Sequence, residues 1–263
     1  MRKLFAVLCL LPLAALPLLA QTRTGGYTWT RCIKVGPNQG GEYRQLQMET
    51  TAKAMEIRVQ EGDVDGWIFA SAFIPSGADT DCDFLLVNIH NGFPPEGQSI
   101  QPFFDKAGVT INRAKWYERL GAVSRLSSIQ LWRNILDIGS VEAGNILRID
   151  NLKLTRHKTA DWTALQNEAW RPAAEAKVRD GSLKSWQAQS IFMPVGTGLE
   201  FNARVISVYA DWAAVGKPVG FREAMQKAHP GKNVDEIFSR VSELQENVKS
   251  QLFNVIAVVG PKK

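Results

Sequence analysis

The sequence predicts an α+β protein built from two tandem units, each with the order β-α-β-β-α-β. The first observation is an internal repeat. A shift of 119 residues superposes residues 42–93 on residues 161–212 without a gap, and 12 of these 52 paired positions are identical. The second is that strand-like and helix-like patterns follow one another in the same order in both halves. That order defines a ferredoxin-like unit, in which two helices cover one face of a four-stranded antiparallel sheet.

The first unit begins with a predicted strand. Tyr27–Val35 alternates in side-chain character and ends at Gly36, Pro37 and Asn38, which favour a turn. Apolar residues then recur at helical spacing over 41–60, and Gly62 is the stop signal expected just after a helix. The remaining predicted elements are strands over 67–74, 84–90 and 129–138, a loop over 92–100 and a helical region over 103–123.

The second unit repeats this plan after a short join. Its predicted strands cover 146–154, 186–193, 201–209 and 251–259, and its predicted helices cover 161–179 and 221–249. The second helix is interrupted at His229, Pro230 and Gly231. The domain boundaries that follow are 1–20 for a signal peptide, 21–139 for the first unit, 140–145 for a linker and 146–263 for the second unit.

Most residues that the two copies share suit backbone and packing roles. The identical positions are Leu46, Gln47, Glu49, Ala54, Glu56, Val59, Gly62, Trp67, Ser71, Phe73, Pro75 and Gly77. The glycines and prolines are best explained by a helix end and a hairpin. Trp67 and its counterpart Trp186 open corresponding strands and are best explained by packing.

A single unit would leave one face of its sheet uncovered. The predicted strand over 84–90 is apolar on both sides. A large apolar sheet face is rarely exposed on a soluble monomer. We therefore expect the two sheets to meet sheet to sheet and bury one another, with a cleft between the two units.

The composition excludes some partners. The chain has 263 residues, 45% of them hydrophobic and 22% charged, and a formal net charge of +5. Removing Arg2 and Lys3 with a leader leaves 5 − 2 = +3. This charge is small and evenly spread, so no nucleic-acid partner is expected.

The first 20 residues have the pattern of a signal peptide. Arg2 and Lys3 precede an apolar stretch over 4–19, and Ala20 precedes a polar residue. The stretch is short and contains two prolines, so we expect cleavage, a periplasmic or secreted protein and no stable membrane span afterwards. An uncleaved anchor and a lipoprotein with Cys9 are less favoured alternatives.

Export bears on the two remaining cysteines, Cys32 and Cys82. In an oxidising compartment they are candidates for a disulfide closing a loop of about 50 residues, worth roughly 4 kcal/mol of chain entropy. The alternative is two isolated buried thiols.

Several motifs resemble the dimeric α/β-barrel superfamily, with the chain most similar to poorly characterised secreted bacterial members. They are Trp170-Arg-Pro172, Lys177-Val-Arg-Asp-Gly181, Ser185-Trp186, Pro194-Val-Gly196, Tyr209-Ala-Asp-Trp212 and Lys227-Ala-His-Pro-Gly-Lys232. The superfamily includes cofactor-free monooxygenases of the antibiotic-biosynthesis type (ABM), EthD-like and NIPSNAP-like proteins, muconolactone isomerase-like enzymes and haem-dependent relatives. The resemblance implies one barrel formed by both halves of this chain, as a monomeric pseudo-dimer or within a homodimer.

Strand parity nominates the candidate ligand-binding residues, which are Trp29, Arg31, Asn88, His90, Arg148, Asp150 and Tyr209. His90 is the preferred functional histidine, because its alternation places it on a face expected to line the cleft. The opposite parity is also open, since a one-residue slip moves every side chain to the other face.

Charged residues on strands need partners when they are buried. Arg31 or Arg148 is expected to form a structural ion pair with Asp150. The alternative is that these arginines point into a pocket for an anionic or phenolic ligand.

Three functions are compatible with these observations. The first is an exported protein of the cell envelope that binds a small apolar or aromatic molecule between the units. The second is a cofactor-free monooxygenase or isomerase. The third is a haem-binding protein with His90 as ligand. The sequence shows no metal-ligand spacing, nucleophile elbow, phosphate loop or dinucleotide motif, so no metal or cofactor is expected in the first two cases and no catalytic residue is assigned.

Overall fold

A computed structural model describes residues 22–260 except 24, 78–79, 97–98 and 197. The expected signal peptide and Cys9 lie outside the described residues. The first unit contains β2 (Tyr27–Val35), α1 (Gly40–Leu46), the π-helical segment η1 (Gln47–Thr51), α2 (Ala52–Gln60), β3 (Gly66–Ile74), β4 (Phe84–His90), α3 (Gln101–Lys106), α4 (Arg113–Val123) and β5 (Ser124–Gly139). A short β1 (Thr22–Arg23) precedes them and pairs with the end of β5.

The second unit has the same order of elements. It contains β6 (Ile146–Leu154), α5 (Thr159–Leu165), the π-helical η2 (Gln166–Trp170), α6 (Arg171–Arg179), β7 (Ser185–Met193), β8 (Ala203–Tyr209), α7 (Trp212–Val215), α8 (Phe221–Ala228), α9 (Val234–Leu244) and β9 (Gln245–Val259). The predicted α+β class with two βαββαβ units is therefore confirmed.

The boundary predicted before the last strand is wrong in each unit, and the helical region predicted over 103–123 is divided into α3 and α4. The last helix ends at Leu244 rather than at residue 249, and β5 begins at Ser124 rather than at residue 129. In both places the polar segment is a strand because it pairs with the first strand of its own unit, Leu154 with Gln245 and Val35 with Ser124. These segments are polar and show no apolar pattern in the sequence. Their conformation is decided by backbone pairing.

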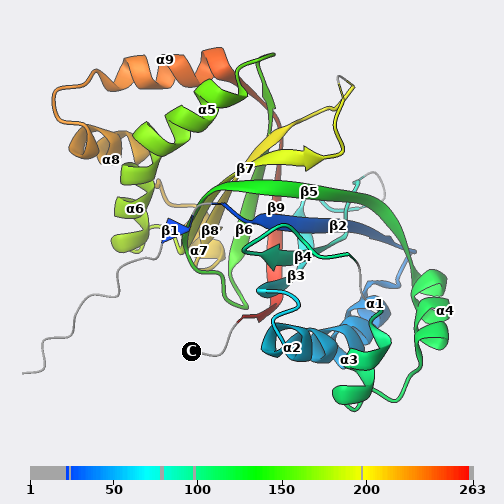
Figure 1. Cartoon of the computed structure of the whole chain (residues 1–263). Coiled ribbons are helices and arrows are strands. Elements are labelled where there is room, and N and C mark those ends of the chain that lie inside the picture. The colour runs from blue at the N-terminus through cyan, green and yellow to red at the C-terminus, as the bar shows by residue number, and fades with distance from the viewer. Residues whose placement is uncertain (1–21, 24, 78–79, 97–98, 197, 261–263) are drawn as a thin grey trace, which may run out of the picture.

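The long strands β5 and β9 close the two sheets into one barrel. Each unit has the ferredoxin-like strand order, β5-β2-β4-β3 in the first and β9-β6-β8-β7 in the second. In addition, β9 pairs with β3 and β5 pairs with β7, all antiparallel. The sheets face one another as predicted, and they are also hydrogen-bonded along both edges (Figure 1).

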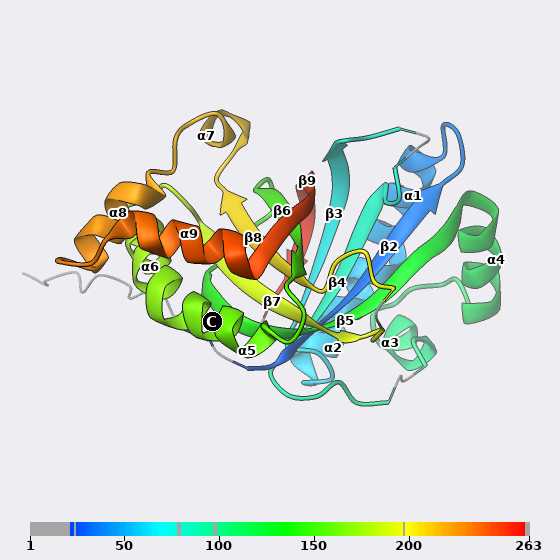
Figure 2. The same cartoon turned by 90° about the horizontal axis from the view of Figure 1, so that it is seen from above.

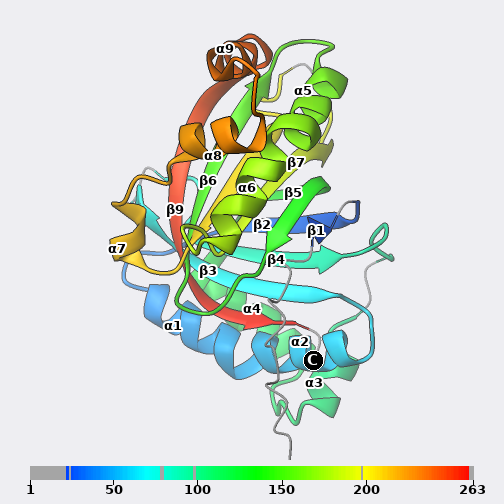
Figure 3. The same cartoon turned by 90° about the vertical axis from the view of Figure 1, so that its left-hand side faces the viewer.

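The helices lie outside this barrel in two groups. Helices α1 to α4 cover the first unit, and α5, α6, α8 and α9 cover the second unit on the opposite side (Figures 2 and 3). The barrel interior is a core shared by both units, with Leu85 and Val87 from β4 packed in one cluster with Ile149 and Ile206 from the second unit.

A polar network crosses the barrel interior at the β5–β7 seam. Gln189 Nε2 donates to Thr28 Oγ1 at 3.2 Å and to Asn134 Oδ1 at 2.7 Å. Its Oε1 accepts from Arg204 Nε at 2.5 Å, and the Arg204 guanidinium lies 4.1 Å from the centre of the Trp132 ring. The two units therefore share buried hydrogen bonds as well as apolar contacts.

Aromatic pairs join the two units on the outside of the barrel, one at each seam, where β3 pairs with β9 and β5 pairs with β7. Phe73 contacts Trp212 with ring centres 4.9 Å apart, and Phe192 contacts Phe93 at 5.6 Å. The 119-residue shift relates Phe73 to Phe192 and Phe93 to Trp212. The two aromatic pairs are thus equivalent contacts between the units, one at each seam.

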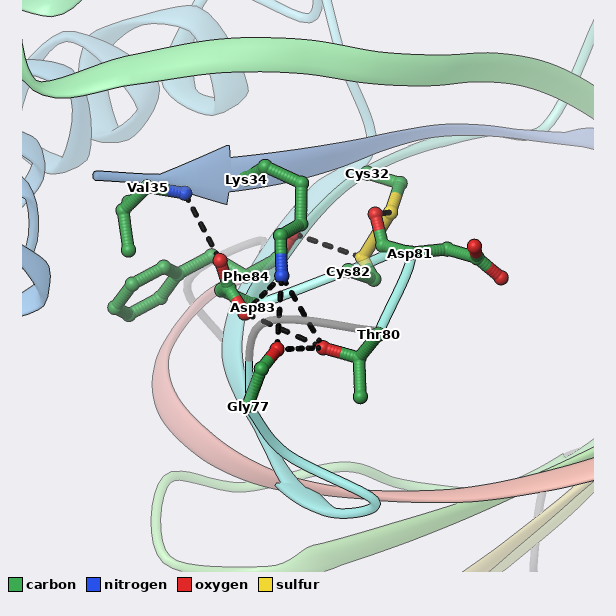
Figure 4. Close-up of polar contacts among 9 residues, drawn as sticks. All are labelled: Cys32, Lys34, Val35, Gly77, Thr80, Asp81, Cys82, Asp83 and Phe84. Atoms are coloured by element: carbon green, nitrogen blue, oxygen red, sulfur yellow. Dashed lines mark hydrogen bonds and ion pairs between the residues drawn. A yellow bond between two sulfur atoms is a disulfide. The ribbon is translucent and has the colours of Figure 1, made fainter. Parts of the chain in front are cut away.

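A disulfide and a buried ion pair anchor the loop between β3 and β4 (Figure 4). Cys32 and Cys82 form a disulfide, with their Cα atoms 5.2 Å apart. Lys34 Nζ donates to Asp83 Oδ1 at 2.9 Å and to the Gly77 carbonyl at 3.1 Å. Asp83 also accepts from the backbone N–H of Val35 at 2.9 Å. The loop is therefore held against β2 at several points.

Candidate functional site

The seven predicted ligand-binding residues lie on the outer face of the barrel. On β4, Leu85 and Val87 belong to the interior core, whereas Phe84 and Leu86 pack beneath the helices of the first unit. Asn88 and His90 continue this alternation and lie on the same outer face as Phe84 and Leu86. The expectation that this parity faces the cleft between the sheets is therefore wrong, because both faces of β4 are apolar and alternation alone could not distinguish them.

The structure divides the seven residues into two groups. The register pairs Trp29 with Asn88 and Tyr27 with His90, so Trp29, Arg31, Asn88 and His90 form one patch on β2 and β4. Arg148, Asp150 and Tyr209 form the second patch, on β6 and β8. The shift of 119 residues relates the patches, with Trp29 matching Arg148 and Arg31 matching Asp150.

In the second patch the charges neutralise one another. Arg148 Nε donates to Asp150 Oδ1 at 3.0 Å, and Ser250 Oγ donates to the same oxygen at 2.5 Å. Burial lowers the pKa of Arg148, but the Asp150 carboxylate and a hydrogen bond with Tyr209 outweigh it, so the pKa is raised. The structural ion pair expected for Arg148 is present. Arg31 does not join it, because it lies in the other unit.

In the first patch Arg31 is half-buried beside its neighbour Trp29, with its guanidinium carbon 5.7 Å from the centre of the indole ring. Within the part of the chain that the structure describes, Arg31 forms no ion pair with a carboxylate. Burial lowers its pKa, and the nearby Arg58 guanidinium lowers it further, against smaller opposite effects of Tyr117 and Tyr43. Arg31 thus lies in a desolvated environment near Arg58, which itself pairs with Asp63.

The helix that covers this patch presents polar groups to it. Tyr43, Gln47 and Thr51 are spaced four residues apart and are all buried. Such spacing places them on one helix face. Tyr43 lies over Phe84 at a ring distance of 4.9 Å, and Met55, one turn after Thr51, is in the same core cluster as Trp67.

Gln47 and Thr51 consequently lie at the level of Trp29 and Arg31 along the sheet. Phe84 pairs with Ile33 on β2, and Asn88 pairs with both Trp29 and Trp67, which fixes the two ends of this stretch. We call Trp29, Arg31, Tyr43, Gln47 and Thr51 the Arg31 cluster.

Four buried atoms of the Arg31 cluster have no hydrogen-bond partner among the described residues. They are Trp29 Nε1, Tyr43 Oη, Gln47 Oε1 and Thr51 Oγ1. Burial also raises the pKa of the Tyr43 phenol, so its hydroxyl stays protonated. The cluster therefore combines one cation with unsatisfied donors and acceptors, an arrangement suited to a polar or anionic ligand.

Sequence reasoning missed the helix side of this cluster. A signal was present, because Gln47 is one of the identical positions of the repeat and continues a helical spacing from Tyr43. The helical spacing was considered only for apolar residues, so the buried polar face with Gln47 and Thr51 was not predicted.

His90 is buried at the end of β4 near charges of both signs. Burial and the Arg58 and Arg31 guanidinium groups lower its pKa, and together they outweigh the opposite effects of Asp65 and Asp63. His90 is therefore held in the neutral form at neutral pH.

A small cavity lies inside the barrel, between the two units. The barrel interior encloses a cavity of about 30 Å³, lined by Thr28, Asp137, Gln187 and Arg204 and by apolar side chains. That volume suits one or two water molecules. An open groove of about 600 Å³ lies between α6 and α8, bordered by Lys177 and Glu223 among others. None of the seven predicted residues lines either space.

The described histidines do not fit a haem. His229 Nε2 already shares a 3.0 Å hydrogen bond with the Ala169 carbonyl, and His157 is exposed in a turn. His90 faces the helices, and neither described cavity is lined by a histidine. Over the same described residues, no cluster of His, Cys, Asp or Glu has three members placed to hold a metal ion. No described helix has the length and apolar character needed to cross a membrane.

No family model matches the chain, and no curated protein matches its sequence. Solved structures match its fold. A putative monooxygenase from Lactobacillus acidophilus NCFM aligns with a TM-score of 0.54 at 9% identity, over 90% of this chain and 97% of that chain. A putative monooxygenase from Fusobacterium nucleatum subsp. nucleatum ATCC 25586 aligns with a TM-score of 0.55 at 9% identity, over 90% and 95%. At this identity the likeness shows the fold alone, which is that of a dimeric α/β barrel.

Proposed function

We propose that the protein binds a small organic anion with an aromatic or apolar body on the outer face of its first unit, at the Arg31 cluster. The observation that carries this proposal is Arg31, a half-buried cation beside Arg58 without a carboxylate partner in the described chain. A desolvated cation is costly unless an anion pairs with it. A ligand carboxylate or phenolate supplies that partner.

The second unit serves as an internal comparison. The same two strand positions there hold Arg148 and Asp150, which pair within the chain. The fold itself therefore does not require an unpaired cation on this face. The difference between the units supports binding in the first unit only.

The surroundings of Arg31 suit the body of such a ligand. Ile129 pairs with Arg31 across β2 and β5 and is 42% exposed, and Tyr117 on α4, which acts electrostatically on Arg31, is 53% exposed. Together with the Trp29 ring they offer apolar surface between solvent and the guanidinium. This site replaces the expected cleft between the units, where the described cavity of about 30 Å³ is too small for such a ligand.

We also propose export to the periplasm or beyond and an origin by tandem duplication. The leader over 1–20 and the repeat support these proposals. Cell fractionation followed by N-terminal sequencing tests the first, and a chain that stays in the cytoplasm and still begins at Met1 would contradict it.

Catalysis on the bound ligand is the second candidate, as a cofactor-free monooxygenase or isomerase. It is favoured by the fold likeness to two putative monooxygenases and by the neutral His90, a group able to accept a proton. Oxygen consumption or product formation with a bound aromatic acid would establish it. Binding without either would leave the ligand-binding role.

Calorimetric titration with benzoate tests the primary proposal. Arg31→Met should weaken binding about 10- to 100-fold, because a hydrogen bond to a charged group contributes about 1.5–3 kcal/mol. Arg125→Met, which removes an exposed arginine from β5, is the matched control and should bind normally. Equal affinity of the wild type and Arg31→Met would reject the site.

A further inference from the structure

Gln47 carries a buried acceptor that no described residue satisfies. Gln47 is the first residue of η1 and is only 1% exposed, yet its Oε1 has no hydrogen-bond partner in the described residues. Leaving such a carbonyl unpaired costs about 1–3 kcal/mol. An apolar side chain of the same size would avoid this cost, so a packing role does not explain the glutamine.

The second unit repeats this feature. Gln166 occupies the same position at the start of η2, is 2% exposed and also has an unpartnered Oε1. Only 12 of the 52 compared positions are identical between the units. Both π-helical segments therefore begin with such a glutamine, and π-helical turns often occur at functional sites. Only the first unit also has a tryptophan, Trp29, at the β2 position that Arg148 occupies in the second unit.

The Arg31 cluster also holds an unpaired donor on the sheet. Trp29 Nε1, on β2, is buried without a partner among the described residues. A hydroxyl group both accepts one hydrogen bond and donates one. One unpaired donor and one unpaired acceptor in the same cluster therefore match a hydroxyl better than they match a second carboxylate.

We infer that Gln47 and Trp29 select a hydroxyl group on the anion bound at Arg31, so that the ligand class is hydroxylated aromatic acids. This inference rests on the proposed function of the Arg31 cluster. In the bound state the ligand hydroxyl donates to Gln47 Oε1 and accepts from Trp29 Nε1, while its carboxylate pairs with Arg31. Gln47 and Trp29 act as specificity-determining residues.

Titration with benzoate and with ortho-, meta- and para-hydroxybenzoate tests this inference. At least one hydroxybenzoate should bind the wild type about tenfold more tightly than benzoate. Gln47→Leu should weaken binding of that hydroxybenzoate more than binding of benzoate, so that the ratio of the two affinities falls from about ten toward one. Gln45→Leu, on the exposed side of the same helix, is the matched control and should keep the wild-type ratio. Trp29→Phe keeps an aromatic ring, removes only the N–H donor and should also reduce the preference.

The outcomes separate this inference from the proposed function. If benzoate binds through Arg31 but all the hydroxybenzoates bind no more tightly, the inference is wrong and the proposed function stands. If Gln47→Leu keeps the full preference, selection does not depend on Gln47 and the inference is again overturned. If none of the acids binds the wild type, both fall together.

Discussion

The arginines Arg31, Arg148 and Arg204 lie on strands and have different kinds of partner. Arg148 pairs with a carboxylate, and Arg204 in the barrel interior donates to Gln189 and lies against Trp132. Burial lowers the pKa of Arg204 to about 9, so it remains a cation at neutral pH. Arg31 is the contrasting case, because it lies against the Trp29 ring but has no carboxylate partner among the described residues. The proposed function follows from this contrast.

The lowered pKa of His90 predicts a pH dependence of stability. The folded state binds the proton less readily than the unfolded state, whose histidine pKa is about 6.5. Stability from neutral His90 is therefore fully present above about pH 6.5 and is lost as pH falls toward the folded-state pKa. In urea unfolding below pH 6.5, His90→Gln should lose stability less steeply than the wild type. An NMR titration giving His90 a pKa above 6.5 would contradict this.

At the scale of elements, both covering helices contain a π-helical segment at the same repeat position. In the first unit Gln47 and Thr51 lie in this segment and are buried, and together with Tyr43, at the same four-residue spacing, they form the polar side of the Arg31 cluster. In the second unit the corresponding residues are Gln166 and Trp170, and Trp170 stacks on Trp186.

The loop between β3 and β4 depends on a buried ion pair. Asp83→Ala should lower the free energy of unfolding by about 3 kcal/mol, because it leaves Lys34 largely buried without its carboxylate. Asp83→Asn should cost less, since Asn202 at the equivalent place in the second unit accepts from the Leu154 N–H at 2.8 Å. Urea denaturation of the three proteins measures the difference. Equal losses for both variants would show that the hydrogen bond from the Val35 N–H, whose acceptor Asp83→Asn keeps, contributes nothing.

At the scale of the whole molecule, closure of the barrel makes the two units interdependent. Each long strand, β5 or β9, is hydrogen-bonded to strands of both units, so neither unit keeps all its strand pairings without the other. The interior core and the seam aromatics also combine residues of both. We therefore regard the chain as one folding unit with two similar halves.

Gln189 links the halves inside the barrel, and replacing it should destabilise both together. Gln189→Leu removes the acceptor of buried Arg204 and the donor to Thr28 and Asn134, which should cost about 3 kcal/mol. Gln251→Leu is the control, because its buried Nε2 has no partner in the described residues and its loss should cost little.

Tryptophan fluorescence and circular dichroism should report coincident single transitions for the wild type and for Gln189→Leu. Two separated transitions would mean that the halves unfold independently. A Gln189→Leu protein as stable as the Gln251→Leu control would show that the interior network contributes little.

The sequence by itself determined the two βαββαβ units, most element boundaries and the residues that occupy equivalent positions. These follow from local periodicity, turn residues and the 119-residue repeat, which do not depend on distant contacts. It also nominated Trp29, Arg31, Asn88 and His90, which the structure brings together on one patch.

Only the tertiary structure decided which face of each strand is inside. Both faces of β4 are apolar, so Leu85 and Leu86 look alike in sequence, and only the position of the helices separates interior from exterior. The disulfide depended likewise on the distance between Cys32 and Cys82. Closure by β5 and β9, and the polar helix face opposite Arg31, arise from pairings and packing between residues far apart in the chain, which no local pattern records.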